Sequence, residues 1–179
     1  MIYKSCCFTG HRNILEKDYN NIYNLIKNCI ENLILEQNVV YFKVGGAIGF
    51  DTICSLCILE LKKKYSDIKL ILILPCKNQH LKWNEKDKEL YNIVLENADK
   101  IMYVSEEYTK DCMLKRNDKL LENSDYCICY LREKTIRGGT LYTFNRAKDK
   151  NIKIYNINDY LKYINFNLLF YFKEEKWKH

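Results

Sequence analysis

Glycine, proline and histidine are scarce in this chain of 179 residues, which holds six glycines, one proline and three histidines. None of the histidines is spaced with a second ligand as a zinc site requires, so we predict no metal site, and no pattern requires a cofactor. Long apolar runs are also missing, and the N-terminus starts directly with a strand-like segment. These absences predict a cytoplasmic protein with no membrane span and no signal peptide.

Disulfide bonds are not expected either, although the chain has nine cysteines. Most of them lie inside strand-like or helix-like stretches, where a cysteine in a chain without a secretion signal is usually a small buried apolar residue. Cys54 and Cys57 have the C-x-x-C spacing of a redox or metal pair, but no second pair or nearby histidine accompanies them. We therefore expect these two cysteines to pack inside a helix.

Strand-like and helix-like segments alternate along the chain with little between them. Strand-like runs occupy residues 2–8, 39–44, 69–74, 100–104, 125–131 and 152–157, and helix-like segments occupy 18–36, 52–65, 83–97, 111–123 and 139–149. The run 69–74 is continuously apolar, as strands buried on both faces are. The alternation predicts an α/β, Rossmann-like, doubly wound fold with a mainly parallel sheet of about six strands and helices on both faces.

The length of the chain fits a single domain. We assign residues 1–157 to a Rossmann-like domain and residues 158–179 to an aromatic-rich, helical extension of that domain. The extension is expected either to pack back on the domain or to contact a second subunit. The sequence leaves both alternatives open, so a homo-oligomer is one expected form of the protein.

The few glycines all lie near the ends of predicted strands. Gly10 follows the first strand, Gly45, Gly46 and Gly49 follow the second, and Gly138 and Gly139 follow the fifth. In an open parallel sheet these junctions lie at the carboxyl edge, where ligands bind. Glycine lets a phosphate approach the backbone, and the helix that follows offers unpaired N–H groups. A tight turn explains any one loop, but three such loops together favour a ligand cleft.

Polar side chains accompany these glycines. After the first strand, Arg12 can make a forked contact to a phosphate, Thr9 can bond a phosphate or ribose oxygen, and His11 is either a ligand or a turn residue bonded to backbone. Asp51 is equally plausible as a helix N-cap and as a ribose-binding or catalytic carboxylate. The last loop, with Thr140 opening the next helix, is typical of a phosphate cradle, and no Walker lysine follows it.

Together these residues resemble the SLOG superfamily, and within it the YpsA-like group. The resemblance spans residues 2–157 and rests on Cys7-Phe8-Thr9-Gly10-His11-Arg12, Gly45-Gly46-Ala47-Ile48-Gly49-Phe50-Asp51, Leu74-Pro75-Cys76, Trp83, Cys112-Met113-Leu114-Lys115-Arg116-Asn117, Ser124-Asp125 and Gly138-Gly139-Thr140. It implies a Rossmann-like fold whose cleft binds nucleotides, nucleotide sugars or related signals.

The same superfamily includes the LOG phosphoribohydrolases, which release a base from a nucleoside monophosphate. Their M-H-x-R-K helix is similar to residues 113–117, which makes Arg116, with Asn117 beside it, the candidate for facing the cleft rather than a surface arginine. Their acidic pair is absent, since Tyr142 and Thr143 stand in its place. Glycosidic cleavage normally needs a carboxylate, and Asp51 is a candidate to supply one from another loop.

The predicted ligand-binding residues are Thr9, Gly10, His11, Arg12, Gly45, Gly46, Ala47, Gly49, Asp51, Arg116, Asn117, Arg137, Gly138, Gly139 and Thr140. Asp51 and Arg116 are in addition the candidate catalytic groups.

Three functions follow, in this order of preference. The first is binding of a nucleotide or nucleotide-derived small molecule, for sensing or sequestration. The second is hydrolysis of an N-glycosidic or phosphate bond of a nucleotide. The third is single-stranded DNA binding, by analogy with the related DprA. The net charge of +6 fits an anionic partner. The lysines and arginines are spread along the chain, however, so nucleic acid is a less favoured partner than a small anionic molecule.

Overall fold

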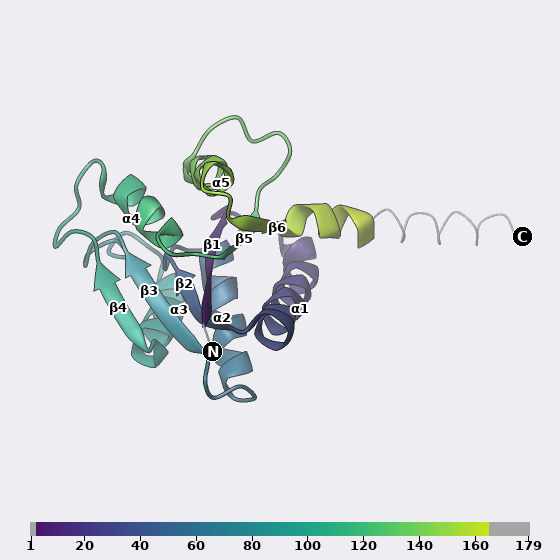
Figure 1. Cartoon of the computed structure of the whole chain (residues 1–179). Coiled ribbons are helices and arrows are strands. Elements are labelled where there is room, and N and C mark those ends of the chain that lie inside the picture. Colours follow the sequence, from purple (N-terminus) through teal and green to yellow (C-terminus); the bar gives the residue numbers. More distant parts are fainter. Residues whose placement is uncertain (1–2, 165–179) are drawn as a thin grey trace, which may run out of the picture.

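The fold is built on a single sheet of six parallel strands, seen in a computed structural model that describes residues 3–164 (Figure 1). The strands are β1 (Lys4–Gly10), β2 (Val39–Val44), β3 (Lys69–Leu74), β4 (Lys100–Tyr103), β5 (Tyr126–Tyr130) and β6 (Lys153–Asn156). Their order across the sheet is β4-β3-β2-β1-β5-β6. The chain moves outward from β1 to β4, then crosses back to place β5 on the other side of β1. The strand order therefore reverses between β1 and β5.

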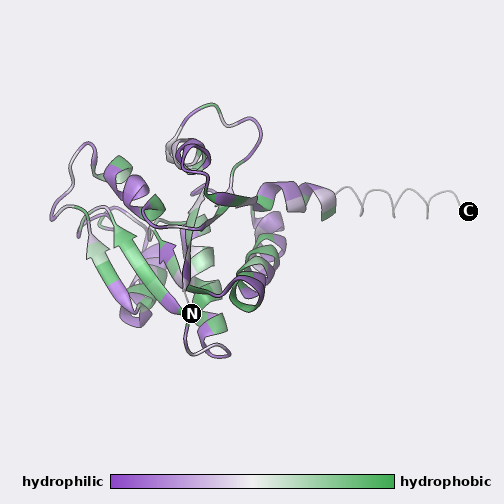
Figure 2. Cartoon of the chain, viewed as in Figure 1, coloured by the Kyte–Doolittle hydropathy of each residue, from purple (hydrophilic) through white to green (hydrophobic). Residues whose placement is uncertain are grey.

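Five α-helices that lie between successive strands cover the two faces of this sheet, and a sixth helical stretch follows β6. The five are α1 (Tyr19–Gln37), α2 (Phe50–Lys62), α3 (Glu85–Asn97), α4 (Cys112–Leu121) and α5 (Gly139–Asp149), and a short 3-10 turn, η1 (Glu16–Asp18), precedes α1. The larger core packs the first three helices on one face, and the smaller core packs α4 and α5 on the other. Figure 2 shows apolar residues concentrated in the strands and on parts of each helix. This two-faced arrangement confirms the predicted doubly wound α/β class.

The first strand is longer than the sequence pattern predicts, because it continues through Gly10. Thr9 and Gly10 pair with Cys129 and Tyr130 of β5, so the neighbouring strand extends the ladder by two residues. The expectation that Gly10 follows the first strand is therefore wrong, because Gly10 is its last residue. Its lack of a side chain serves packing, since a Cβ at this position would lie 2.3 Å from the Phe50 ring.

Helix α2 also begins and ends earlier than the predicted range 52–65. Gly49 precedes it with φ of 79°, a conformation that favours glycine and that turns the chain into the helix two residues sooner. Cys54 and Cys57 of this helix are both fully buried in the larger core, as expected. Within the described residues no group of three or more potential metal-binding side chains occurs.

The chain after β6 is helical over residues 157–164, with Ile157 and Leu161 buried against the larger core. The rest of the predicted extension, residues 165–179, lies outside the described residues. Across the part of the chain that is described, no helix is long and apolar enough to cross a membrane.

Candidate functional site

A cavity of about 340 Å³ opens at the carboxyl ends of β1 and β5, where the strand order reverses. Its walls come from the loop after β1, the start of α2, one face of α4 and the start of α5. The lining residues are Phe8, Thr9, Gly10, His11, Arg12, Ala47, Asp51, Met113, Arg116, Asn117, Leu120, Arg137, Gly138, Gly139 and Thr140. Ligands of open α/β sheets bind in this position, so the cavity is the candidate site.

A buried ion pair lies at the wall of this cavity. Nη1 of Arg116 on α4 is 3.3 Å from Oδ2 of Asp51 at the start of α2, and both residues are more than 90% buried. The same carboxylate oxygen accepts a hydrogen bond of 3.1 Å from the backbone N–H of Ala47. Asp51 does not cap α2, whose N-cap residue is Gly49, so the N-cap interpretation of Asp51 is wrong. The carboxylate instead bonds to the preceding loop and to α4.

Desolvation perturbs both members of this pair. Burial raises the pKa of the Asp51 carboxyl, and the positive charge of Arg116 opposes the rise. Burial also lowers the pKa of the Arg116 guanidinium, and the negative charge of Asp51 opposes that change. Each charge therefore depends on the other. The Nε atom of Arg116 is buried and has no hydrogen-bond partner within residues 3–164.

Two further arginines, Arg12 and Arg137, also line the cavity, and both side chains are exposed. Helix α5 begins at its rim, where Gly138 has φ of 117° and no side chain caps the first turn. The start of a helix carries partial positive charge on its unpaired N–H groups. Among the described lining residues, Asp51 is the one carboxylate. The cavity wall therefore carries net positive charge.

His11 connects the first loop to the loop after β5. Its Nε2 accepts a hydrogen bond of 3.2 Å from the backbone N–H of Arg132 and lies 3.2 Å from Oγ1 of Thr135. Its backbone carbonyl accepts a bond from the N–H of Phe50. His11 is thus bonded to backbone, as one of the two interpretations held, while it also lines the cavity. Burial, followed by the charge of Arg132, lowers the pKa of its imidazole.

Tyr142 and Thr143, which occupy the place of the LOG acidic pair, lie outside the cavity lining. The Tyr142 hydroxyl donates to both carboxylate oxygens of Asp118 at 3.0 Å, and the Thr143 hydroxyl donates to the carbonyl of Gly139 at 2.8 Å. The Tyr142 bond ties α5 to Asp118 of α4, whereas the Thr143 bond stays within α5. Asn117 also ties α4 to α5, since its Nδ2 lies 3.5 Å from the Gly139 carbonyl.

Twelve of the fifteen predicted ligand-binding residues line this one cavity, and Gly45, Gly46 and Gly49 do not. Gly45 and Gly49 leave space for parts of two lining residues, whereas the neighbours of Gly46 lie outside the cavity lining. A Cβ on Gly45 would lie 1.4 Å from Nη1 of Arg116, and one on Gly49 would lie 2.0 Å from the Arg12 carbonyl. Gly46 has φ of 64°, and its carbonyl accepts a hydrogen bond from Gln79.

Sequence reasoning missed three apolar lining residues, namely Phe8, Met113 and Leu120. Met113 and Leu120 lie three residues before and four after Arg116, which is the spacing of one helix face. That spacing was the signal available in the sequence.

The fold and this cleft place the molecule among Rossmann-like α/β domains with a ligand cleft at the strand-order switch. The YpsA family model, described as the YspA SLOG family, matches residues 6–168, and the chain belongs to this family. The family membership confirms the resemblance to the SLOG superfamily and its YpsA-like group.

Several curated proteins are similar in sequence. The chain is 32% identical over 131 residues to the uncharacterized SPbeta prophage-derived protein YoqJ of Bacillus subtilis, covering 66% of this chain and 75% of YoqJ. It is 30% identical over 132 residues to a UPF0398 protein of Brevibacillus brevis, covering 70% of each chain. A UPF0398 protein of Bacillus cereus is 26% identical over 183 residues, covering 97% of both chains.

Two solved structures of DNA processing protein A (DprA) share the fold. The protein from Streptococcus pneumoniae matches with a TM-score of 0.60 and 17% identity, over 85% of this chain and 49% of that protein. The protein from Helicobacter pylori, which has a single-stranded DNA binding mode, matches with a TM-score of 0.56 and 17% identity, over 92% and 81%. At this identity the likeness concerns the fold.

Proposed function

We propose that the protein binds a phosphate-bearing nucleotide, or a small molecule derived from one, in the cleft at the carboxyl ends of β1 and β5. The observation that carries this proposal is Arg116. Its guanidinium is buried at the cavity, and its Nε has no partner within the described residues. A buried N–H group without a partner costs about 1 to 3 kcal/mol. Because Nε is closed off from solvent in this structure, a ligand oxygen satisfies it once the Arg116 side chain turns toward the cavity.

The charge of the wall supports an anionic ligand. Arg12, Arg116 and Arg137 line the cavity against a single carboxylate, Asp51. The first turn of α5 adds unpaired N–H groups at the rim, beside Gly138 and Gly139. Guanidinium groups and helix N-termini are the two protein features that bind phosphate most often. This arrangement favours phosphate over a neutral sugar or base as the anchoring group.

Binding is favoured over hydrolysis because the one carboxylate at the cavity is engaged. Asp51 accepts bonds from Arg116 and from the Ala47 backbone. Tyr142 and Thr143 supply no acid from α5. The hydrolase alternative predicts release of a free base from nucleoside monophosphates, which chromatography detects. Release that persists in Asp51→Asn would exclude Asp51 as the reacting group.

A thermal-shift screen tests the binding proposal. The panel contains nucleoside monophosphates, nicotinamide dinucleotides, ADP-ribose and cyclic nucleotides. A ligand at 100 times its Kd stabilises the native state by about 2.7 kcal/mol, which raises Tm by roughly 5 to 10 °C in a domain of this size. No shift with any phosphate ligand would contradict the proposal.

A matched pair of variants locates the site. Arg137→Ala removes a lining guanidinium, and we expect affinity to fall by about 10- to 100-fold, the range for a lost charge-assisted hydrogen bond. Lys134→Ala removes an exposed cation from the same loop but outside the cavity lining, and affinity should stay unchanged. Equal losses in both variants would mean that only general charge attracts the ligand.

Single-stranded DNA binding is the second candidate, favoured by the fold shared with Helicobacter pylori DprA. Stacking platforms for bases are needed for such binding. Of the aromatic rings that line the cavity, Phe8 is fully buried, which leaves His11 as the partly exposed one. Fluorescence anisotropy of a labelled oligonucleotide at two salt concentrations tests this candidate. Salt-dependent binding that Arg137→Ala weakens would support it.

A further inference from the structure

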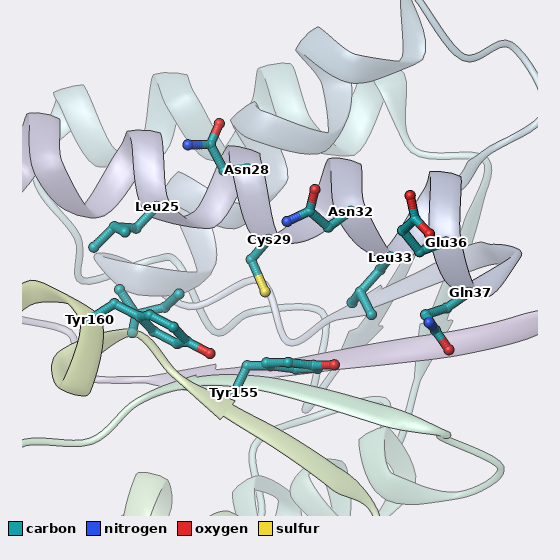
Figure 3. Close-up of a pocket in the computed structure, with 10 residues that line it drawn as sticks. Leu25, Asn28, Cys29, Asn32, Leu33, Glu36, Gln37, Tyr155 and Tyr160 are labelled. Carbon is teal, nitrogen blue, oxygen red and sulfur yellow. The ribbon is translucent and has the colours of Figure 1, made fainter.

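A second cavity, of about 500 Å³, lies away from the cleft. It is bounded on one side by α1 and on the other by β6 and the helical stretch 157–164. It shares no lining residue with the candidate site. Its lining residues are Leu25, Asn28, Cys29, Asn32, Leu33, Glu36, Gln37, Tyr155, Ile157 and Tyr160. We call it the α1 groove. Figure 3 shows Leu25, Cys29 and Leu33 of α1 pointing toward Tyr155 and Tyr160 on the opposite wall.

The groove has an apolar floor and a polar rim. The floor consists of the aliphatic and sulfur side chains of α1 and the rings of Tyr155 and Tyr160. The exposed residues Asn28, Asn32 and Glu36 repeat every four positions along α1 and form the rim. Tyr160 is 47% exposed, which is high for an aromatic ring that faces apolar neighbours. An open apolar floor with a polar rim is typical of a docking surface.

The chain itself supplies a segment with matching chemistry. Residues 165–172, Asn-Phe-Asn-Leu-Leu-Phe-Tyr-Phe, contain six apolar side chains out of eight. We call them the aromatic segment. Side chains of this kind are stabilised by burial away from water. The segment begins directly after the helical stretch 157–164, which contributes Ile157 and Tyr160 to the groove wall.

We propose that the α1 groove is the docking site of the aromatic segment of the same chain. The segment is long enough to follow the groove, because the floor from Leu25 to Gln37 extends about 18 Å along a helix and eight residues can span up to about 26 Å. A segment tethered this close to its groove has an effective concentration in the millimolar range. It therefore occupies its own groove in preference to that of a second copy. This proposal does not depend on the ligand of the cleft.

The thiol of Cys29 provides a test. It lies in the groove and is the one cysteine that is not fully enclosed, since the other eight are buried. Three single variants, Leu168→Cys, Phe170→Cys and Phe172→Cys, place a second thiol along the aromatic segment of the full-length chain. After mild oxidation with a disulfide exchange reagent, we expect at least one variant to form an intramolecular disulfide with Cys29. Mass spectrometry of peptides from the monomer band identifies the bond.

The controls separate the outcomes. The same three variants in a Cys29→Ser background should form no such bond. A covalent dimer joined through Cys29 would show that the segment docks on a second copy. No bond in any variant, under conditions in which the reagent itself modifies Cys29, would show that it docks elsewhere. Both results overturn the proposal.

A labelling experiment gives an independent readout. Burial raises the pKa of the Cys29 thiol to about 12, so modification by a maleimide is slow and its rate can be followed. The double substitution Leu169→Asp with Phe170→Asp should speed modification of Cys29 by at least about 10-fold while circular dichroism stays native. An unchanged rate would contradict docking in the groove.

Discussion

At the scale of single residues, the Asp51–Arg116 pair decides the behaviour of the cleft. Asp51→Asn keeps an oxygen that can accept from Ala47 but leaves Arg116 as an uncompensated buried charge. We expect it to lower the free energy of unfolding by about 3 to 5 kcal/mol, measured by urea denaturation. Adding Arg116→Met removes the stranded charge, so the double variant should be more stable than Asp51→Asn alone.

An exposed ion pair serves as the control for these two variants of the Asp51–Arg116 pair. Glu85 and Lys88 lie 2.9 Å apart, and the Glu85 side chain is 91% exposed. Glu85→Gln should therefore cost no more than about 1 kcal/mol. A loss for Asp51→Asn as small as this would mean that water reaches the cleft pair.

His11 makes the loops of the cleft sensitive to acid. An imidazole titrates near pH 6.5 in an unfolded chain, and burial lowers its pKa in the folded protein. The stability that depends on neutral His11 is therefore complete above about pH 6.5, and it is lost as the pH falls toward the lower folded pKa. Protonation of Nε2 would also break its bond from the Arg132 N–H.

Denaturation at two pH values checks this prediction. Between pH 7.5 and 5.5 the natural protein should lose more stability than His11→Gln, whose side chain does not titrate. Equal losses in the two proteins would assign the acid sensitivity to other groups.

Residue roles were also the hardest part to predict from the sequence. Gly45 was assigned to a ligand because it follows a strand, yet its missing Cβ leaves space for Arg116. Nothing in the local sequence links these two positions, since the contact forms only when α4 packs beside the loop. His11 was left with two interpretations for the same reason, because Arg132 and Thr135 come from a distant loop.

At the scale of elements, α4 and α5 are held together by Asp118, which accepts bonds from Tyr142 and contacts Arg146 at 3.5 Å. Tyr142→Phe removes the hydroxyl that donates to Asp118. We expect a loss of about 0.5 to 1.5 kcal/mol in the free energy of unfolding. Tyr163→Phe is the matched control, because this ring is 70% exposed. It should change the free energy of unfolding by less than about 0.5 kcal/mol.

Tyr142→Phe also has a consequence for the cleft, because α4 and α5 both carry residues that line it. If the α4–α5 contact sets the width of the cleft, Tyr142→Phe should also weaken binding of whichever phosphate ligand the thermal-shift screen finds. Unchanged affinity together with lower stability would show that Asp118 acts on packing alone.

Elements were predicted better than residue roles. Apolar alternation along the chain is a local signal, and it placed all six strands and five helices within a few residues. The errors fall where a neighbour decides a boundary, as when β5 extends β1 through Gly10. The strand order is not a local property either, since it depends on which way each crossover turns.

At the scale of the whole molecule, packing holds the fold together without covalent links. All nine cysteines are free, and eight of them are buried. We therefore expect the Tm of the protein to be the same with and without a reducing agent, measured by scanning calorimetry. A lower Tm in reductant would reveal a disulfide that forms in solution.

The central place of β1 has a consequence for how the protein is made. Cys6 pairs with Phe42 on one side and with Tyr126 on the other, so the second neighbour of this strand is 120 residues distant along the chain. A ribosome adds about 5 to 20 residues per second, so β5 emerges roughly 6 to 24 s after β1. During that interval one edge of β1 has no partner strand. Its residues Cys6, Cys7 and Phe8, which are fully buried in the folded protein, are then open to solvent. Nascent chains arrested before β5 are therefore the form of this protein most prone to aggregate.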